Sequence, residues 1–388
     1  MPSPKTILVL HLAGQYPLAG VVWQALHYLV GLRELGHEVY YIEDSGAPPY
    51  DPLVKSIVAD PTYNVTCLQQ TMERFGFADH WVYWDMDRNI YYGLSRTRLQ
   101  ALYDKADVII NLCGATLPRD EHRRHGRLLY IETDPVFEQI RIAQGEQRTL
   151  DFLARHDVCF TYGENLGAAD CPIPLSGFTW QKTRPPVVLD LWEERADPVC
   201  RYFTTVATWQ NKGKDIAFQG QTYYWSKHVN FLKFLDLPRR TAQPFELAIE
   251  TVDEAVQADL AARGWHLVDA VERSATVEGY REYIYASRGE FTVAKDIYVQ
   301  PRSGWFSDRS VCYLAAGKPV VTQETGFSKF IPSGQGLFAF SNMEEAVAAL
   351  EAINADYLRH AHAAREIAAE YFAADKVLRK LLQDAGVE

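Results

Sequence analysis

Long apolar runs are missing from this sequence of 388 residues, and no stretch approaches the roughly 18 or more apolar residues of a membrane span. The six cysteines are scattered, with neither a CxxC pair nor the Cys/His spacing of a zinc site. One lysine precedes an N-terminal apolar run that is too short for a signal peptide. We therefore expect a cytoplasmic protein in a reducing environment, with no transmembrane segment, no metal and no other cofactor.

Two common nucleotide-binding signatures are also absent. The loop that follows the first expected strand has the sequence LAGQYPLAG, which is not the GxGxxG of a nicotinamide-binding loop. Gly213 and Lys214 are followed by Asp215, where a P-loop needs Ser or Thr. The formal net charge of −11 argues against a broad nucleic-acid surface, so we expect no nucleic-acid partner.

The chain begins with a βαβ pattern. Residues 5–11 form a near-continuous apolar strand, residues 22–32 carry apolar side chains at helical spacing, and residues 37–43 form the next strand. A parallel sheet follows from this order. Further strands are expected at 108–112, 128–132 and 158–161. Residues 1–175 are therefore interpreted as one doubly wound α/β domain.

A proline-rich stretch at 171–198 is the best candidate for the connection to a second domain. The domain at 176–345 is predicted from strands at 202–207, 245–250, 265–270, 280–286, 295–300 and 320–322. Asp253 is expected to cap a helix that ends at Gly264. Residues 346–388 carry apolar stripes at helical spacing and are interpreted as a helical tail.

The most informative segment is 295–326, KDIYVQPRSGWFSDRSVCYLAAGKPVVTQETG. Its pattern predicts a strand at 297–299, a small loop, and a helix that Ser307 or Asp308 caps and Gly317 ends. A helix N-terminus after such a loop can bind an anion, which would explain the cationic Arg309 in the first turn. An ordinary βαβ unit with a well-capped helix is the alternative interpretation.

This segment resembles a known family. The block AAGKPVV, followed by Thr325, Gly326 and Phe327, is similar to the second domain of nucleotide-sugar glycosyltransferases of the GT-B fold, in the retaining family-4-like group and its spore-protein-like branch. The resemblance implies two Rossmann-like domains facing a cleft, and a last helix that packs back on the first domain. It also implies donor-binding residues at Ala270, Val271, Gly304, Ser307, Asp308, Arg309, Thr325, Gly326 and Phe327.

Two acidic positions of that family are not acidic here. The Glu that usually holds the donor ribose falls at Cys312, and the earlier Glu falls at Gly304. Either Asp308 takes over the ribose, or the chain has lost the usual donor chemistry.

Other candidates lie at expected strand ends, where ligands bind in open α/β sheets. Lys214 and Lys295 could neutralise a diphosphate, or could be solvated lysines. Asp134 could act as a general base, although Asp before Pro also forms turns. His11 could be a base or a contact to the donor sugar, or a structural histidine. By resemblance, the adjacent loop with Gly14 and Gln15 lies on the acceptor side of the cleft.

Three functions stay open at this point. The leading one is a metal-independent glycosyltransferase that moves a sugar from a nucleoside-diphosphate sugar to an unknown acceptor in the interdomain cleft. A decayed, nucleotide-binding scaffold and a non-hydrolysing nucleotide-sugar epimerase are the alternatives. The segment Asp85-Met86-Asp87 matches a metal–diphosphate motif of another fold, but we expect it to be a solvated turn. The sugar, the base, the acceptor and the oligomeric state are not specified by the sequence.

Overall fold

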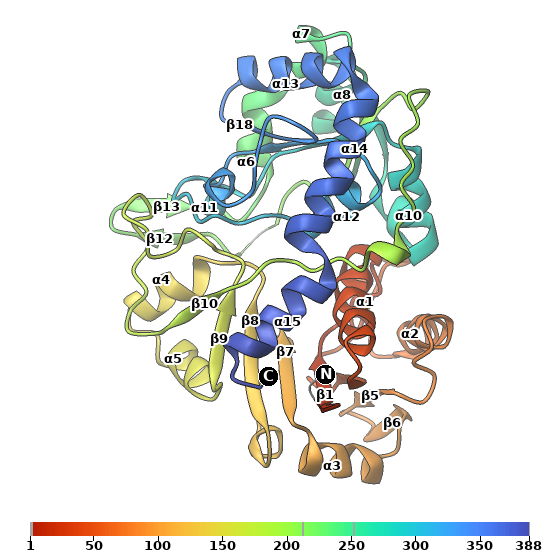
Figure 1. Cartoon of the computed structure of the whole chain (residues 1–388), viewed down its shortest axis with the longest axis vertical. Coiled ribbons are helices and arrows are strands. Elements are labelled where there is room, and N and C mark those ends of the chain that lie inside the picture. Colours follow the sequence, from red (N-terminus) through yellow and green to blue (C-terminus); the bar gives the residue numbers. More distant parts are fainter. Residues whose placement is uncertain (1–2, 212, 251–252, 388) are drawn as a thin grey trace.

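A computed structural model describes residues 3–211, 213–250 and 253–387. Two sheets lie one above the other along the long axis of the molecule (Figure 1). The lower sheet has eight strands, in the spatial order β10 (Trp180–Lys182), β9 (Val158–Thr161), β8 (Arg127–Glu132), β7 (Val108–Leu112), β1 (Thr6–Leu10), β2 (Glu38–Glu43), β5 (Trp81–Asp85) and β6 (Ile90–Gly93).

All neighbours in this first sheet are parallel except β5 and β6, which form an antiparallel hairpin. From β1 the chain adds strands first on the β2 side and then on the β7 side. The order therefore reverses between β1 and β7, which is the topological switch point where doubly wound sheets bind ligands. The segment Asp85-Met86-Asp87 lies in the β5–β6 hairpin, but Asp85 ends β5 and only 10% of its side chain is exposed, so it is not the fully solvated turn that the sequence suggested.

The upper sheet has six parallel strands and is also doubly wound. Its spatial order is β15 (Trp265–Asp269), β14 (Phe245–Glu250), β11 (Phe203–Thr208), β16 (Gly289–Thr292), β17 (Val320–Gln323) and β18 (Leu337–Phe340). The order reverses between β11 and β16. Two small hairpins stand outside both sheets, β3 (Tyr50–Asp51) with β4 (Ser56–Ile57) and β12 (Ile216–Phe218) with β13 (Gln221–Tyr223).

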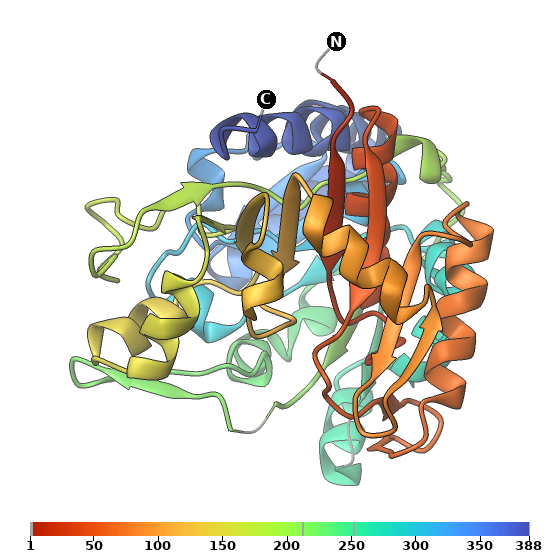
Figure 2. The same cartoon turned by 90° about the horizontal axis from the view of Figure 1, so that it is seen from below.

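Helices cover both faces of the sheets (Figures 1 and 2). Those of the lower part are α1 (Ala19–Glu34), α2 (Thr62–Arg74), α3 (Arg96–Lys105), α4 (Phe137–Ala143) and α5 (Gln147–Ala154). Those of the upper part are α6 (His228–Phe231), α7 (Leu237–Arg240), α8 (Glu254–Ala262), α9 (Ala270–Ser274), α10 (Val277–Ala286), α11 (Asp296–Val299) and α12 (Asp308–Ala315). Among the described residues, no helix is both long and apolar enough to cross a membrane.

The C-terminal helices connect the two halves. Helices α13 (Met343–Ala355) and α14 (Tyr357–Ile367) lie with the upper sheet, and α15 (Ala374–Asp384) packs against α1 of the lower half (Figure 1). Gly31 of α1 makes this contact possible, because a Cβ atom there would lie 2.7 Å from Leu378 and 2.8 Å from Ala374. One hydrophobic cluster then runs from α1 through α12 to α15, so the two halves share part of their core.

Two of the expected strands are helices. Residues 280–286 belong to α10, which begins where the Thr276 hydroxyl accepts a bond from the Gly279 N–H at 3.0 Å. Its tyrosines favoured a strand, but the i, i+3, i+7 spacing of the buried Val277, Tyr280 and Ile284 is helical. Residues 297–299 belong to the short helix α11, and the true strand is β16 just before it. Lys295 therefore precedes a helix and does not begin a strand.

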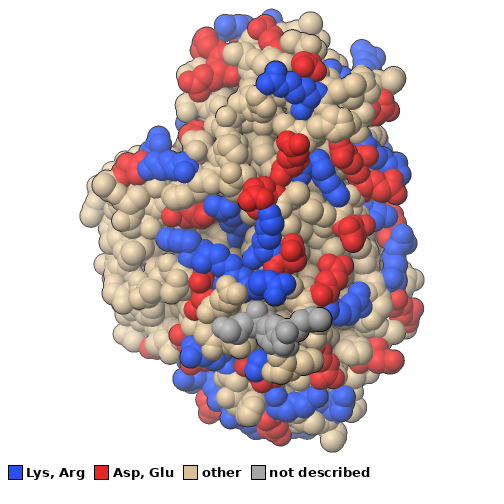
Figure 3. Space-filling view, viewed as in Figure 1, with Lys and Arg blue, Asp and Glu red and all other residues tan. Residues whose placement is uncertain are grey.

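On the face drawn in Figure 3, several Lys and Arg side chains gather in the middle of the surface, with Asp and Glu side chains beside them. The chain as a whole has a formal net charge of −11.

Candidate active site

A cavity of about 530 Å³ lies between the carboxyl edges of the two sheets. Leu12 after β1 and Cys113 after β7 line it from the lower sheet, at the switch point of that sheet. Thr208 at the end of β11 and Lys295 after β16 line it from the upper sheet, at the second switch point. The volume falls in the range of small-molecule sites, which is about 300–1,000 Å³.

The Arg309 guanidinium is a cation that three hydrogen-bond acceptors of the protein hold in place. Its Nε donates to Glu290 Oε1 at 2.5 Å, its Nη1 to the Val206 carbonyl at 2.8 Å and its Nη2 to Thr292 Oγ1 at 2.8 Å. The Glu290 side chain is fully buried, whereas 13% of the Arg309 side chain is exposed. Burial opposes the charge on Arg309, but Glu290 raises the pKa of the guanidinium and keeps it charged. Arg309 is thus a preorganised cation at the cavity surface.

Lys227 is a second cation, and the sequence did not reveal it. The side chain lines the cavity just before α6, and its ammonium has no hydrogen bond or ion pair with any described residue. Burial and then the neighbouring Arg309 charge hold the pKa of Lys227 well below its ordinary value. A partly buried ammonium next to a guanidinium is unfavourable unless an anion lies between them.

Asp134, Lys295 and Tyr298 form a polar group across the cleft. Lys295 Nζ lies 2.7 Å from Asp134 Oδ1, and the Tyr298 hydroxyl donates to the same oxygen. Burial would raise the pKa of Asp134, but the Lys295 charge and the two hydrogen bonds hold it below its ordinary value. The Asp134 side chain is still 42% exposed, so a ligand in the cavity can reach it.

Lys214 lies near this polar group, against the ring of Trp225. Its Nζ lies 4.8 Å from the centre of the Trp225 ring, and Lys295 Nζ lies 3.8 Å from that centre. Both contacts are in the range of cation–π interactions. Residue 212 of the same expected phosphate-binding loop lies outside the described residues.

A hydrogen-bond chain connects Asp308 to the first domain. Gln24 Nε2 donates to Asp308 Oδ2 at 3.2 Å, and Gln24 Oε1 lies 3.0 Å from His11 Nε2. Burial raises the pKa of Asp308, and it lowers the pKa of His11 to about 4. His11 is fully buried and does not line the cavity. Any influence of His11 on a ligand would pass through Gln24.

Cys312 lies at the floor of the cavity, one helical turn after Asp308 on α12. Its Sγ is 3.8 Å from His27 Nε2, and only 3% of the residue is exposed. Burial lowers the pKa of His27 to about 3 and raises that of Cys312 well above its ordinary value, so both groups are neutral. This floor is apolar in character and holds no carboxylate in place of the family Glu.

The cavity brings together seven of the residues that the sequence suggested: Asp134, Lys214, Ala270, Val271, Lys295, Asp308 and Arg309. It does not bring in eight others, which are His11, Gly14, Gln15, Gly304, Ser307, Thr325, Gly326 and Phe327.

Gly304 lies where the second domain closely approaches the first. Its φ is +82°, its N–H donates to the Thr325 carbonyl at 2.7 Å, and a Cβ atom would lie 2.4 Å from the Asn165 nitrogen. Asn165 also donates to the carbonyls of Ser303 at 3.0 Å and Arg302 at 2.7 Å. The loop therefore docks on the first domain, and the glycine is needed for that close approach.

The other four residues of the expected donor loops also lie outside the cavity. Ser307 precedes α12 without making a capping bond. The Thr325 hydroxyl donates to the Trp305 carbonyl at 2.5 Å, and Phe327 packs edge-on against Phe306. Gly326 adopts a φ of +96° next to these two residues.

The Gly14 loop is held by one buried carboxylate. Gly14 N–H donates to Glu43 Oε2 at 2.7 Å, and Gln15 N–H donates to Glu43 Oε1. Asn64 Nδ2 closes the loop by donating to the Gly14 carbonyl at 2.7 Å. These backbone donors are therefore already used within the protein.

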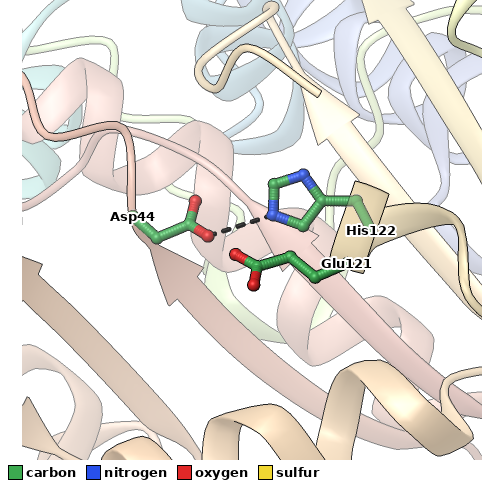
Figure 4. A group of neighbouring side chains, drawn as sticks. All are labelled: Asp44, Glu121 and His122. Carbon is green, nitrogen blue, oxygen red and sulfur yellow. Dashed lines mark hydrogen bonds and ion pairs between the residues drawn. The ribbon is translucent and has the colours of Figure 1, made fainter. Parts of the chain in front are cut away.

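Asp44, Glu121 and His122 form a separate cluster of metal-ligand residue types, with ligand atoms within 4.8 Å of one another (Figure 4). His122 Nε2 lies 3.1 Å from Asp44 Oδ2. Arg119 supplies the positive charge there, because its Nε donates to Glu121 at 2.7 Å and its Nη2 donates to Asp44. Burial opposes the Asp44 charge, but His122 and Arg119 hold the pKa of that carboxyl far below its ordinary value. The cluster is a self-satisfied ionic network.

Comparisons with known proteins give a match at the level of structure. No family model and no curated protein matches the sequence. An α-glucosyltransferase bound to UDP and a 13-mer DNA shares 11% identity, with 99% of this chain and 100% of that one covered and a TM-score of 0.62. HepE from Anabaena with UDP and glucose shares 12% identity over 99% and 100% of the two chains, with a TM-score of 0.57. Sucrose-phosphate synthase from Thermosynechococcus elongatus shares 12% identity over 98% of each chain, with a TM-score of 0.56.

These structures cover both sheets and the C-terminal helices, so the likeness extends over the whole described architecture. Two doubly wound sheets that meet at their switch points, with a helix crossing back onto the first, are the arrangement that the sequence resemblance implied. The chain has the GT-B fold.

Proposed function

We propose that the protein is a glycosyltransferase that uses a nucleoside-diphosphate sugar as donor. The observation that carries this proposal is the Lys227 ammonium, which has no partner among the described residues, beside Arg309 in a cavity formed at both switch points. Two such cations need an anion between them, and a diphosphate supplies one. Lys214 and Lys295 add positive charge nearby. The cations would neutralise the leaving diphosphate without a bound metal.

Asp134 is the candidate for the proton transfer. Its carboxylate stands at the end of β8, faces the cavity and is kept ionised by Lys295. In that state it can accept the proton of an acceptor hydroxyl as the hydroxyl oxygen bonds to the sugar carbon and the diphosphate leaves. Asp308, held by Gln24, is the carboxylate closest in sequence to the missing family Glu and is the candidate ribose ligand.

One of the similar structures contains DNA, but the charge of −11 favours a different acceptor for this chain. A small molecule or a glycan bound from the first-domain side fits the cavity better.

The test is a thermal-shift screen with UDP, GDP, ADP and dTDP, followed by detection of free nucleoside diphosphate released from the matching nucleotide sugars. A ligand that binds only the native state stabilises it by about 2.7 kcal/mol at a hundredfold excess over its dissociation constant. Binding together with donor turnover, unchanged by a metal chelator, supports a metal-independent transferase. Binding with no turnover, even with pooled acceptors, would favour a nucleotide-binding scaffold.

A further inference from the structure

The Glu250 carboxylate lies at one end of the cavity. Glu250 is the last residue of β14, it is partly buried, and its side chain makes no hydrogen bond or ion pair with any described residue. In the sheet register Thr208 pairs with Glu250, and the next strand pairs Ile249 with Asp269. Thr208, Glu250 and Ala270 therefore stand side by side on three neighbouring strand ends.

The opposite end of the cavity is cationic. Lys295 follows β16, which is separated from β14 by β11, so the two strand ends are on the order of 10 Å apart at the usual strand spacing. Lys227 lies close enough to both Arg309 and Lys295 for its charge to interact with theirs. The cavity thus has a cationic end and, beyond β11, an end with a carboxylate that no described residue pairs.

The first domain covers the carboxylate end. Lys55 in the β3–β4 hairpin lies 3.4 Å from Asp269 Oδ2, next to Ala270. Tyr50 of the same hairpin has its pKa raised by burial and then by the Glu250 charge. A flat group placed here would have the apolar Ala270 and Val271 near it and would present its edge to Glu250.

An ionised carboxylate only accepts hydrogen bonds, so it selects a base edge that donates. Guanine offers two adjacent donors, N1–H and the N2 amino group, which match the two oxygens of one carboxylate. Uracil offers a single N–H between two carbonyl oxygens, and adenine offers its amino group next to a ring-nitrogen acceptor. Two parallel N–H···O bonds to a charged acceptor are strong and directional.

We propose that this site takes a guanine nucleotide and that Glu250 binds the Watson–Crick edge of the base. The proposal rests on the proposed function, since it identifies the base of the same nucleotide-sugar donor. UDP would lack the second N–H donor to the carboxylate. It would also place a uracil carbonyl against the carboxylate, and both acceptors would stay unpaired, which disfavours UDP further.

The experiment measures the dissociation constants of GDP, IDP, UDP and 2′-deoxy-GDP by calorimetry, for the full chain and for Glu250→Gln. IDP lacks only the N2 amino group, so it isolates one of the two bonds. Glu254→Gln is the matched control, because Glu254 is an exposed carboxylate four residues later that does not line the cavity. Melting temperatures without ligand verify that each variant is folded.

We expect GDP to bind about tenfold or more tightly than either IDP or UDP, as charge-assisted hydrogen bonds require. Glu250→Gln should weaken GDP by a similar factor, leave UDP equal or tighter, and so remove most of the preference. Glu254→Gln should change none of these ratios.

Two results would overturn the assignment while leaving the transferase proposal intact. One is tighter binding of UDP than GDP in the native chain. The other result has two parts. Glu250→Gln would weaken GDP and UDP binding equally, and 2′-deoxy-GDP would bind the native chain more weakly than GDP by the same factor, which together would make Glu250 a ribose ligand. Failure of every diphosphate to bind would overturn the donor site itself.

Discussion

Arg309 and Glu290 form a buried ion pair directly beneath the cavity, with Arg309 Nε 2.5 Å from Glu290 Oε1. The pair explains how a cation can stand in the first turn of α12, where the helix dipole opposes it. Thr292 and the Val206 carbonyl complete the guanidinium's contacts, so its position does not depend on a ligand.

The first prediction concerns this pair. Arg309→Ala leaves a fully buried carboxylate unpaired, and removing one partner of such a pair costs about 3–5 kcal/mol of unfolding free energy. Urea denaturation measures the loss. The double variant Arg309→Ala/Glu290→Gln should recover much of it, because no buried charge is left over. A stable single variant that merely fails to bind diphosphate would mean that the pair is not a structural element.

Substitution of Lys227, unlike that of Arg309, should not destabilise the protein. Because its ammonium has no partner in the part of the chain that the structure describes, Lys227→Met should leave the protein as stable or more stable at neutral pH, yet weaken nucleoside-diphosphate binding about tenfold or more. Binding of the corresponding nucleoside, which lacks phosphate, should change little. Calorimetry with the two ligands makes the comparison, and equal losses for both would remove Lys227 from the phosphate site.

Lys227 also predicts a pH dependence. Its pKa in the folded protein is lowered, so between that pKa and the ordinary value of about 10.4 the unfolded chain binds more protons and stability rises with pH. A bound diphosphate favours the charged ammonium, so binding takes up protons and affinity falls as the pH rises above the lowered pKa. Calorimetry in buffers of different ionisation enthalpy reports the proton uptake, which Lys227→Met should abolish.

Asp134 gives a prediction about turnover. Asp134→Asn keeps a group of the same shape for Lys295 and Tyr298 but cannot accept a proton, so donor turnover should fall about 10²–10⁴-fold. Diphosphate affinity should change only a few-fold, because Asp134 is not a phosphate ligand. Steady-state kinetics and calorimetry separate the two effects. Turnover within threefold of the native value would exclude Asp134 as the base.

The sequence predicted the doubly wound sheets because their central strands are buried on both faces and appear as continuous apolar runs. β1 and β7 have this pattern. It missed α10, whose tyrosines suit a strand locally, and it placed the strand of β16 one segment too late. Tertiary packing decides such short segments, and local propensity does not.

The residues of the candidate site could also be predicted from the sequence only in part. Asp134 follows an expected strand and could be found from the topology alone, whereas Lys295 was placed at the start of an expected strand that is in fact the helix α11. The role of Gly304 could not be found in this way, because its partner Asn165 is far away in the chain and belongs to the other domain. Lys227 carries no local motif, and only the fold shows that its ammonium has no partner. Glu250 could have been proposed as a site residue, since it ends an expected strand, but nothing in the sequence distinguished it from a solvated carboxylate.

The last prediction concerns Cys312, where the family usually has Glu. Cys312→Glu would place a carboxylate in a buried position beside neutral His27 and one turn from Asp308, with the Glu290 charge also near. Burial of an unpaired charge and repulsion at i, i+4 spacing should lower the melting temperature and leave donor binding equal or weaker. Cys312→Ser is the control for loss of the thiol, because it fits the same space. If Cys312→Glu instead tightens nucleotide binding or raises turnover, Asp308 is not the substitute ribose ligand, and the native chain is a transferase that has lost part of its donor site.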